Sequence, residues 1–241
     1  MTMNWLDADW PAPDFIKAGT TLRQGGVSKS PYDSFNLATH VGDELSQVNQ
    51  NRAMLKVPND VQWLEQVHST EAVLLPNDEK IPKADAAYTS DKNVICAVMT
   101  ADCLPLLITD KQGSCVAAIH AGWRGLCDGI VEATIRKLPI EAEKLMVWLG
   151  PAIGADVYEV GKEVYDAFTK EHDEAKQAFT ATTEGHWLFD IYWLARFRLI
   201  KMGVTQIYGG DHCTLSEEDK FFSYRRDGVT GRMASLIWIE T

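Results

Sequence analysis

The stretch MTADCLPLLITDKQGSCVAAIHAGWRG, residues 99–125, contains two apolar runs separated by a polar turn. The runs Leu104–Thr109 and Cys115–Ile119 have the length of strands, and each has apolar residues on both faces, which predicts a sheet covered on both sides. A tight turn before the first run would expose the thiol of Cys103, and His120 follows the second run directly. This segment therefore predicts a buried strand pair with a thiol and an imidazole at its rim.

Further strands and helices are expected on both sides of this segment. Short apolar or β-branched runs predict strands at Val61–Val67, Val73–Leu75, Val94–Met99, Met146–Leu149, Gln206–Tyr208 and Ala234–Ile239. Helical periodicity predicts four helices. The first runs to Leu55 with Ser46 as its cap, the second runs from Gly125 to Leu138, and the third covers Lys162–Lys170. The fourth runs from Ile191 to Met202, with Asp190 as its cap and Gly203 as its stop. Strands that are both adjacent and helix-connected indicate a mixed α/β (α+β) fold. No linker or repeat divides the chain, so residues 1–241 are expected to form a single domain.

Composition restricts the class of protein. The chain is 46% apolar and 24% charged, which is ordinary for a globular protein, and its net charge of −11 argues against binding the nucleic-acid backbone. It has no apolar stretch near the ~20 residues that span a bilayer. The acidic start MTMNWLDADW does not resemble a secretory signal, and five cysteines, an odd number, are typical of reduced thiols. A cytoplasmic protein without membrane contact is expected.

Three residues in separate segments form a candidate metal shell. His68 ends the run LEQVH, Cys103 lies in MTADCLPL, and His120 lies in AAIHAGWRG. Two imidazoles and one thiolate suit zinc, and an open fourth position is typical of a catalytic metal site. Their separations of 35 and 17 residues match no short zinc-finger pattern, so the fold must bring them together. The alternative is that each histidine simply ends a strand through a hydrogen bond.

Two neighbours of these residues add candidate roles. Arg124 follows Gly122 at a predicted helix start, where a cation and the helix N-terminus would attract an anion. Its alternative role is a surface ion pair. Asp102 precedes Cys103 directly and is a candidate catalytic group that orients a ligand or transfers a proton.

Longer motifs resemble one bacterial family. TLRQGGVSKSPYDSFNLATHVGDE, WLEQVHS, CAVMTADCLPLL, AAIHAGWRGLCDGI, WLGPAIG, YEVGKEV and FFSYRRDGVTGRMASLIWIE together are similar to the YfiH, or laccase-domain, family. Members of this family are described as purine nucleoside phosphorylases with adenosine deaminase activity, as polyphenol oxidases and as peptidoglycan-editing factors. The resemblance implies zinc at His68, Cys103 and His120, on a fold similar to cysteine-hydrolase-like toxin domains. Here Leu22 separates Thr21 from Arg23, which departs from the family pattern and puts a role of the Thr21 hydroxyl in doubt.

The resemblance implies a zinc-dependent purine nucleoside phosphorylase for adenosine, inosine and methylthioadenosine, with adenosine deaminase activity. Two alternatives stay open: an amidase-type peptidoglycan-precursor editing enzyme that uses Cys103 as nucleophile and His120 as base, and a copper-dependent polyphenol oxidase. The chain has six histidines and no His-x-His pair, so a complete laccase set of copper sites is not expected. Zinc is the expected cofactor, and copper is the alternative metal.

Candidate substrate residues lie outside the metal shell. The loop from Arg23 to Ser28 could cradle phosphate with its backbone amides, or it could be an ordinary glycine turn. Asn36 and His40 could orient substrate or close the pocket floor. Tyr224 could stack on a base, and Arg225 could meet phosphate or ribose oxygens. Adjacent side chains of an extended segment point to opposite faces, so at most one arginine of the pair at 225 and 226 should face the site. The expected partners are a nucleoside and phosphate, and the oligomeric state stays open.

Overall fold

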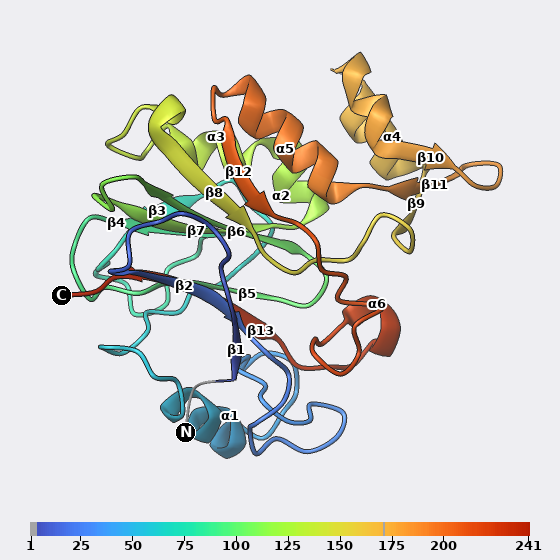
Figure 1. Cartoon of the computed structure of the whole chain (residues 1–241). Coiled ribbons are helices and arrows are strands. Elements are labelled where there is room, and N and C mark those ends of the chain that lie inside the picture. The colour runs from blue at the N-terminus through green and yellow to red at the C-terminus, as the bar shows by residue number, and fades with distance from the viewer. Residues whose placement is uncertain (1–3, 171) are drawn as a thin grey trace.

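The computed structural model describes residues 4–170 and 172–241, and it is built from three sheets with helices packed between and beside them (Figure 1). The largest sheet has the strand order β12-β8-β6-β7-β4-β3. Its strands are β3 (Ala72–Leu74), β4 (Ala86–Thr89), β6 (Leu104–Asp110), β7 (Val116–Ala121), β8 (Leu145–Leu149) and β12 (Gln206–Gly209). A four-stranded sheet has the order β1-β2-β13-β5, from β1 (Trp5–Asp7), β2 (Ile16–Thr21), β5 (Cys96–Thr100) and β13 (Met233–Ile239). The mixed α/β class expected from the sequence is confirmed.

The predicted strand pair β6–β7 forms the centre of the molecule. The two strands pair antiparallel with Pro105 opposite His120, and every residue of both is buried. Leu104 and Leu106 pack with the helices on one face, whereas Leu107 packs against the four-stranded sheet on the other. Figure 1 shows this layering, with the helices above the large sheet and β2, β5 and β13 below it. The expectation of a sheet covered on both sides is therefore confirmed.

The helices are α1 (Leu45–Ala53), α2 (Trp123–Asp128), α3 (Ile130–Ile135), α4 (Lys162–Thr169), α5 (Ile191–Lys201) and α6 (Tyr224–Asp227), with 3-10 turns at Ala142–Lys144 and Asp173–Ala178. Asp190 caps α5 as predicted, because its side chain accepts a hydrogen bond from the backbone of Trp193. The helix predicted from Gly125 to Leu138 is instead the pair α2 and α3. Gly129 separates them with a φ of 99°, a left-handed conformation that interrupts the helix. Ser46 lies within α1 rather than capping it.

The strand predicted at Val61–Val67 is irregular instead, with one bridge between Glu65 and Lys83. Side-chain amides hold this segment in place of a strand ladder. Gln62 bonds the backbone of Asn77, and the amide of Gln66 bonds both the N–H and the carbonyl of Met99. A segment held in this way can place His68 without continuing a strand.

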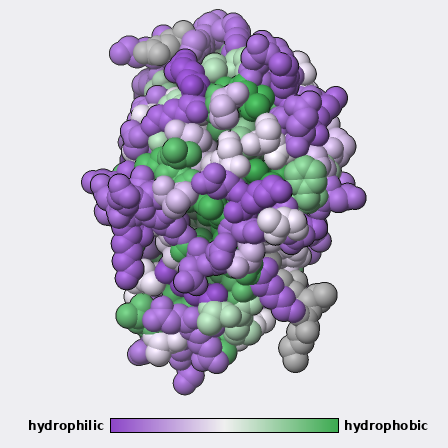
Figure 2. Space-filling model, turned by 90° about the vertical axis from the view of Figure 1, so that its left-hand side faces the viewer, coloured by the Kyte–Doolittle hydropathy of each residue, from purple (hydrophilic) through white to green (hydrophobic). Residues whose placement is uncertain are grey.

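A small third sheet projects beside α4, with the order β10-β11-β9 from β9 (Glu159–Gly161), β10 (Phe179–Ala181) and β11 (His186–Phe189). Its strands, like β1, β2 and β4, were not expected from the sequence, because three to six residues carry little periodicity. Among the described residues, no helix is long and apolar enough to cross a membrane. Figure 2 shows one face of the molecule, on which hydrophobic residues form small patches between hydrophilic ones. The opening residues 1–3 of the acidic start lie outside the described residues.

Candidate metal centre

The fold brings His68, Cys103 and His120 together. One ligand atom from each residue lies within 4.8 Å of the others, and the two imidazole rings meet edge to face with centroids 4.7 Å apart. Cys103 lies just before β6 and His120 lies in β7, so the pairing of Pro105 with His120 places thiol and imidazole side by side. His68 reaches them from the irregular segment, and it stays exposed while His120 is buried.

Asp85, which the sequence analysis did not single out, holds this group together. Its side chain is fully buried directly before β4, and one carboxylate oxygen accepts hydrogen bonds from His120 Nδ1 at 2.8 Å and from the backbone N–H of His68 at 3.0 Å. The other oxygen accepts from the backbone and the hydroxyl of Ser69, at 2.6 and 2.7 Å. These bonds stabilise the backbone of His68, whose φ of 60° is unusual for a residue with a side chain. One carboxylate thus positions both histidines.

The charges of this cluster favour a proton on His120. Burial lowers the pKa of His120, but the neighbouring Cys103 sulfur and the Asp85 carboxylate outweigh burial and raise this pKa to about 9. Burial alone would raise the pKa of Asp85, yet hydrogen bonds from His120 and Ser69 bring it to about 2. An ionised Asp85 can only accept, so His120 Nδ1 donates to it. The other ring nitrogen, Nε2, is then the one that faces Cys103 and can bind a metal.

The residues fit a metal ion. The Asp85–His120 bond is the carboxylate–histidine arrangement that orients imidazole ligands at metal sites. Space is kept open beside the ligands by Gly122, because a Cβ there would lie 2.3 Å from His68 Nδ1 and 3.2 Å from Cys103 Sγ. Two imidazole nitrogens and one thiolate sulfur are donors that zinc and copper both accept. His68, Cys103 and His120 could therefore hold a metal ion.

Zinc affinity should depend on pH through His120. Zinc must displace the Nε2 proton, so the apparent affinity for zinc should rise with pH until the pH exceeds the His120 pKa of about 9. The stability of the metal-free protein should instead fall as pH rises. A pKa raised from 6.5 stabilises the folded state below pH 6.5, and this contribution is lost as pH rises through about 9. Competition titrations with a chelator and urea melts between pH 6 and 10 measure both trends. A zinc affinity that does not change with pH would contradict this assignment.

A cavity of about 480 Å³ opens onto the candidate metal centre. It is lined by His40, Gln66, His68, Met99, Thr100, Ala101, Cys103, His120, Trp123, Tyr224 and Arg232. This volume lies within the usual range for small-molecule sites. The ligand atoms therefore face a space that a small molecule can enter.

Two of the predicted substrate residues, His40 and Tyr224, line this cavity. Arg232 also lines it, although the sequence did not predict a role for this residue. Tyr224 is 60% exposed, and the Arg232 guanidinium lies 5.7 Å from the centre of its ring. Burial and the nearby charge of Arg232 lower the pKa of His40. One nitrogen of Arg232 is held by the carbonyls of Thr230 and Gly231, which fixes the cation at the cavity wall.

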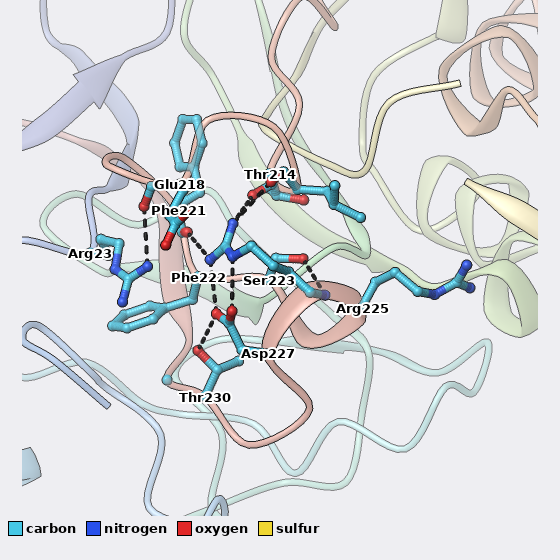
Figure 3. A network of polar contacts seen from close by, with 12 residues as sticks. Arg23, Thr214, Glu218, Phe221, Phe222, Ser223, Arg225, Asp227 and Thr230 are labelled. Carbon is cyan, nitrogen blue, oxygen red and sulfur yellow. Dashed lines mark hydrogen bonds and ion pairs between the residues drawn. The ribbon is translucent and has the colours of Figure 1, made fainter. Parts of the chain in front are cut away.

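Of the two alternatives for the loop at Arg23, the hydrogen bonds favour the glycine turn over the phosphate cradle. The backbone amides of Gly25 and Gly26 donate to the Ser34 hydroxyl, so they are already occupied inside the protein. The Arg23 guanidinium bonds the carbonyl of Asp33 and, as Figure 3 shows, that of Glu218. The side chain of Arg23 therefore ties two loops together outside the cavity.

Asn36 follows the structural alternative that the sequence left open. It is fully buried, where its amide donates to Ala38 and Asp43 and accepts from the backbone of Arg232. It therefore supports the wall that carries Arg232 without lining the cavity itself.

The segment around Arg225 is the short helix α6 and not an extended strand, so the expected alternation does not apply. Arg225 donates to the Glu159 carbonyl, lies over the Tyr158 ring and extends away from Thr214 and Asp227 (Figure 3). Its neighbour Arg226 bonds Asp227 and backbone carbonyls. Neither arginine lines the cavity.

Arg124 lies exposed over the Trp123 ring, 4.3 Å from its centre, and its charge helps to lower the pKa of His68 after burial and His120. It forms no ion pair among the described residues, and it does not line the cavity. Trp123 does line the cavity, beside the candidate ligands.

Asp102 points away from the metal ligands. Its two carboxylate oxygens accept from the Thr214 hydroxyl and from the backbone N–H of Arg225, each at 2.6 Å. Its φ of 88° turns the chain sharply before Cys103. Asp102 thus joins the turn that carries Cys103 to the start of α6, which carries Tyr224.

Sequence signals for the missed residues were weak. Asp85 is a single acid between alanines in KADAAY, and Arg232 stands between Gly231 and a buried strand. A charged residue inside or beside an apolar run is rare without a partner, and this would have been the usable signal.

Comparison with known proteins identifies the family of this chain. The family model described as multi-copper polyphenol oxidoreductase laccase matches residues 17–240. A purine nucleoside phosphorylase of Haemophilus influenzae is 49% identical over 99% of this chain and all of its own. The Escherichia coli relative, named purine nucleoside phosphorylase YfiH, is 48% identical over 95% of this chain and 96% of its own.

Solved structures show the same fold. A Neisseria meningitidis protein of the DUF152 family superimposes with a TM-score of 0.94 at 48% identity, covering 99% of this chain and 100% of its own. YlmD from Geobacillus stearothermophilus superimposes with a TM-score of 0.88 at 29% identity, covering 100% of this chain and 98% of its own.

Proposed function

The chain belongs to the multi-copper polyphenol oxidoreductase laccase family, and from this premise we propose that it is a zinc-dependent purine nucleoside phosphorylase with adenosine deaminase activity. Adenosine, inosine and methylthioadenosine are the proposed substrates. The observation that carries the proposal is the His68, Cys103 and His120 group in the wall of a cavity of about 480 Å³, a volume suited to a nucleoside. The names of the relatives at 48–49% identity support the phosphorylase part of this proposal.

Zinc held by His68, Cys103 and His120 would supply a Lewis acid that polarises a bound substrate or water. The protein's own residues would do the rest. Arg232 is a cation fixed at the cavity wall, and we assign the phosphate to it, with His40 beside it. Tyr224 offers an exposed ring on which a purine can stack.

In phosphorolysis, a phosphate oxygen forms a bond to C1′ of the ribose while the bond from C1′ to the purine nitrogen breaks. The electron pair leaves with the base, which takes up a proton. Arg232 would hold the attacking anion against a chain with a net charge of −11, so its contribution should fall mainly on the KM for phosphate. In deamination, water replaces the amino group at C6 and ammonia leaves.

Asp102 is assigned a positioning role in this scheme. It holds the Thr214 hydroxyl and the start of α6, so it places Tyr224 relative to Cys103. Both oxygens are engaged in these bonds, which leaves the carboxylate poorly placed to exchange a proton with substrate.

The function is tested with metal-replete protein, adenosine and phosphate, followed by chromatography of the bases and assay of ribose 1-phosphate. We expect adenine or hypoxanthine together with ribose 1-phosphate, and loss of nearly all activity in Cys103→Ala. Cys213→Ala is the matched control, because Cys213 is a half-buried thiol outside this cavity. Unchanged nucleoside, or equal activity in wild type and Cys103→Ala, would overturn the proposal.

Thr214→Val should raise the KM for nucleoside roughly tenfold, because a hydrogen bond to a charged group contributes about 1.5–3 kcal/mol and here it positions α6. Zinc content should not change, since Thr214 contacts no candidate ligand. Thr214→Ser keeps the hydroxyl and should restore the KM. Steady-state kinetics with zinc analysis measures this split, and a fall in kcat with an unchanged KM would contradict the positioning role.

A specific arrangement favours a second candidate, an amidase-type editing enzyme. Cys103 lies beside His120 Nε2, and Asp85 accepts from Nδ1, which is the order of nucleophile, base and orienting acid in cysteine hydrolases. Metal content separates the two schemes. Activity that is abolished by a chelator and restored by zinc supports the phosphorylase. Activity in metal-free protein that alkylation of Cys103 abolishes supports the hydrolase.

The family description also names polyphenol oxidation. Among the described residues, one group of three metal-binding side chains is present, the His68, Cys103 and His120 group. A laccase needs additional copper sites, so any oxidation of phenols would depend on one copper ion at this group. Copper loading followed by absorption spectroscopy tests this, with an intense blue band as the result in its favour.

A further inference from the structure

A second cavity, of about 670 Å³, lies apart from the metal centre and shares no lining residue with the cavity there. It is formed by the C-terminal half of α1 and the irregular segment that follows, and it is lined by Asn49, Arg52, Ala53, Leu55, Val57, Pro58, Asn59, Asp60, Val61 and Trp63. Leu55, Val57 and Val61 also pack against the buried core beside the four-stranded sheet. One wall of this cavity is therefore apolar and firmly supported.

Arg52 is held rigidly in this cavity. Its Nε donates to the Leu37 carbonyl at 2.8 Å, and its guanidinium lies 4.3 Å from the centre of the Trp63 ring. The hydrogen bond and the cation–π contact together fix the position of the guanidinium. The edge that carries the two terminal nitrogens is left over, because Nε is the only Arg52 nitrogen with a protein acceptor among the described residues.

The charge of Arg52 has no anionic partner in the described part of the chain. Three other arginines, Arg23, Arg198 and Arg226, form ion pairs with carboxylates. Burial lowers the pKa of Arg52 to about 10, and no carboxylate offsets this effect. Asp60 lines the same cavity without forming an ion pair with Arg52, so it leaves the guanidinium edge open. Arg196 and Arg232 are also half-buried without an ion pair, but their terminal nitrogens donate to backbone carbonyls, whereas those of Arg52 have no such acceptor among the described residues.

We propose that this cavity binds a small organic anion, with one carboxylate or phosphate group on the free edge of Arg52 and an aromatic or aliphatic body against Val57, Val61 and Trp63. The planar guanidinium offers two parallel N–H donors, which match two oxygens of either group. Asp60 disfavours a second negative charge on the body of the ligand. The proposal does not rest on the proposed phosphorylase reaction, although the charge of Arg52 also helps to lower the pKa of His40 in the other cavity.

Calorimetry on the full-length protein tests the proposal with three probes of similar size: phenyl phosphate, benzoate and uncharged benzyl alcohol. We expect one or both anions to bind and benzyl alcohol to bind at least about tenfold more weakly, because it lacks the charge-assisted pair. Binding of phenyl phosphate alone would identify a phosphate ligand, and binding of benzoate alone a carboxylate ligand. Failure of both anions to bind, or equal binding of benzyl alcohol, would overturn the site.

Substitutions of Arg52 show whether the probe binds in this cavity. Arg52→Met keeps the apolar stem and should weaken anion binding at least about tenfold, whereas Arg52→Lys keeps a charge without the two-donor edge and should weaken it several-fold. Arg124→Met removes an exposed arginine that lines neither cavity, and it should leave the affinity unchanged. Thermal melting shows whether each variant folds, and Arg52→Lys decides the question if Arg52→Met does not fold. Wild-type affinity in a folded Arg52 variant, or a loss that follows Arg124→Met, would refute the assignment.

Discussion

Gly122→Ala should abolish zinc binding while the protein still folds. A methyl group at this position would lie 2.3 Å from His68 Nδ1, closer than real contacts come, and 3.2 Å from Cys103 Sγ, which is tight. The backbone of Gly122 has a φ of −66°, which alanine adopts freely, so the effect is purely steric. His68 is exposed, and its ring can swing outward rather than unfold the chain. Mutation of a residue that hydrogen-bonds a metal ligand typically lowers metal affinity 10–100-fold. Displacing the ligand itself should have a larger effect, so we expect zinc affinity to fall at least about 100-fold.

Zinc analysis after dialysis, a chelator competition titration and the adenosine assay measure this effect. Gly161→Ala is the matched control, because a Cβ there meets no atom within 4 Å and should leave zinc content and activity unchanged. A Gly122→Ala protein with full zinc content would show that His68 is not a ligand. Unfolding of this variant alone would show that the His68 ring cannot move outward.

Asp85→Asn should lower both the stability of the protein and its affinity for zinc. The carboxylate accepts hydrogen bonds from His120 Nδ1 and from the backbone N–H groups of His68 and Ser69. In asparagine, an NH2 group replaces one of the two accepting oxygens, and its N–H donors would face these other donors. Removing one partner of a buried charged pair costs about 3–5 kcal/mol, so the free energy of unfolding measured with urea should fall by this amount. Loss of the imidazole's orienting partner should weaken zinc binding by a further 10–100-fold.

Asp110→Asn separates these two effects. Asp110 is a buried carboxylate at the other end of the β6–β7 pair, where it accepts from the backbone of Gln112 and Ser114. This variant should lose stability and keep its zinc affinity. If Asp85→Asn and Asp110→Asn change zinc affinity equally, Asp85 acts only on folding and does not orient the ligands.

Local pattern predicted the central part of this fold well. Two apolar runs around a polar turn identified β6 and β7, because complete burial on both faces leaves a continuous apolar signal. The cap and the stop of α5 were also visible, since Asp190 and Gly203 act on the backbone nearest to them. The pattern failed at Gly129, where an apolar stripe continues through a helix break, and at Val61–Val67, where side-chain amides replace a ladder.

Within the site, position along the chain predicted some residues better than others. His68, Cys103 and His120 each stand at the end of an apolar run, and the structure brings all three together. Arg23 lies in a glycine-rich loop that looks suited to phosphate. The backbone amides of Gly25 and Gly26 in this loop instead donate to the hydroxyl of Ser34, eight or nine residues further along the chain. No local pattern reveals which distant side chain will occupy a donor.

By itself, the amino-acid sequence determined the family, the mixed α/β class, the central strand pair and the candidate metal ligands, because each of these is written in neighbouring residues. Only the tertiary structure decided that Asp85 holds both histidines, that Arg232 lines the cavity, and that Arg225 and Asp102 are engaged elsewhere. These roles depend on contacts between residues 17 to 123 positions apart. Burial and hydrogen-bond geometry at that range follow from how sheets and loops pack, which no short segment encodes.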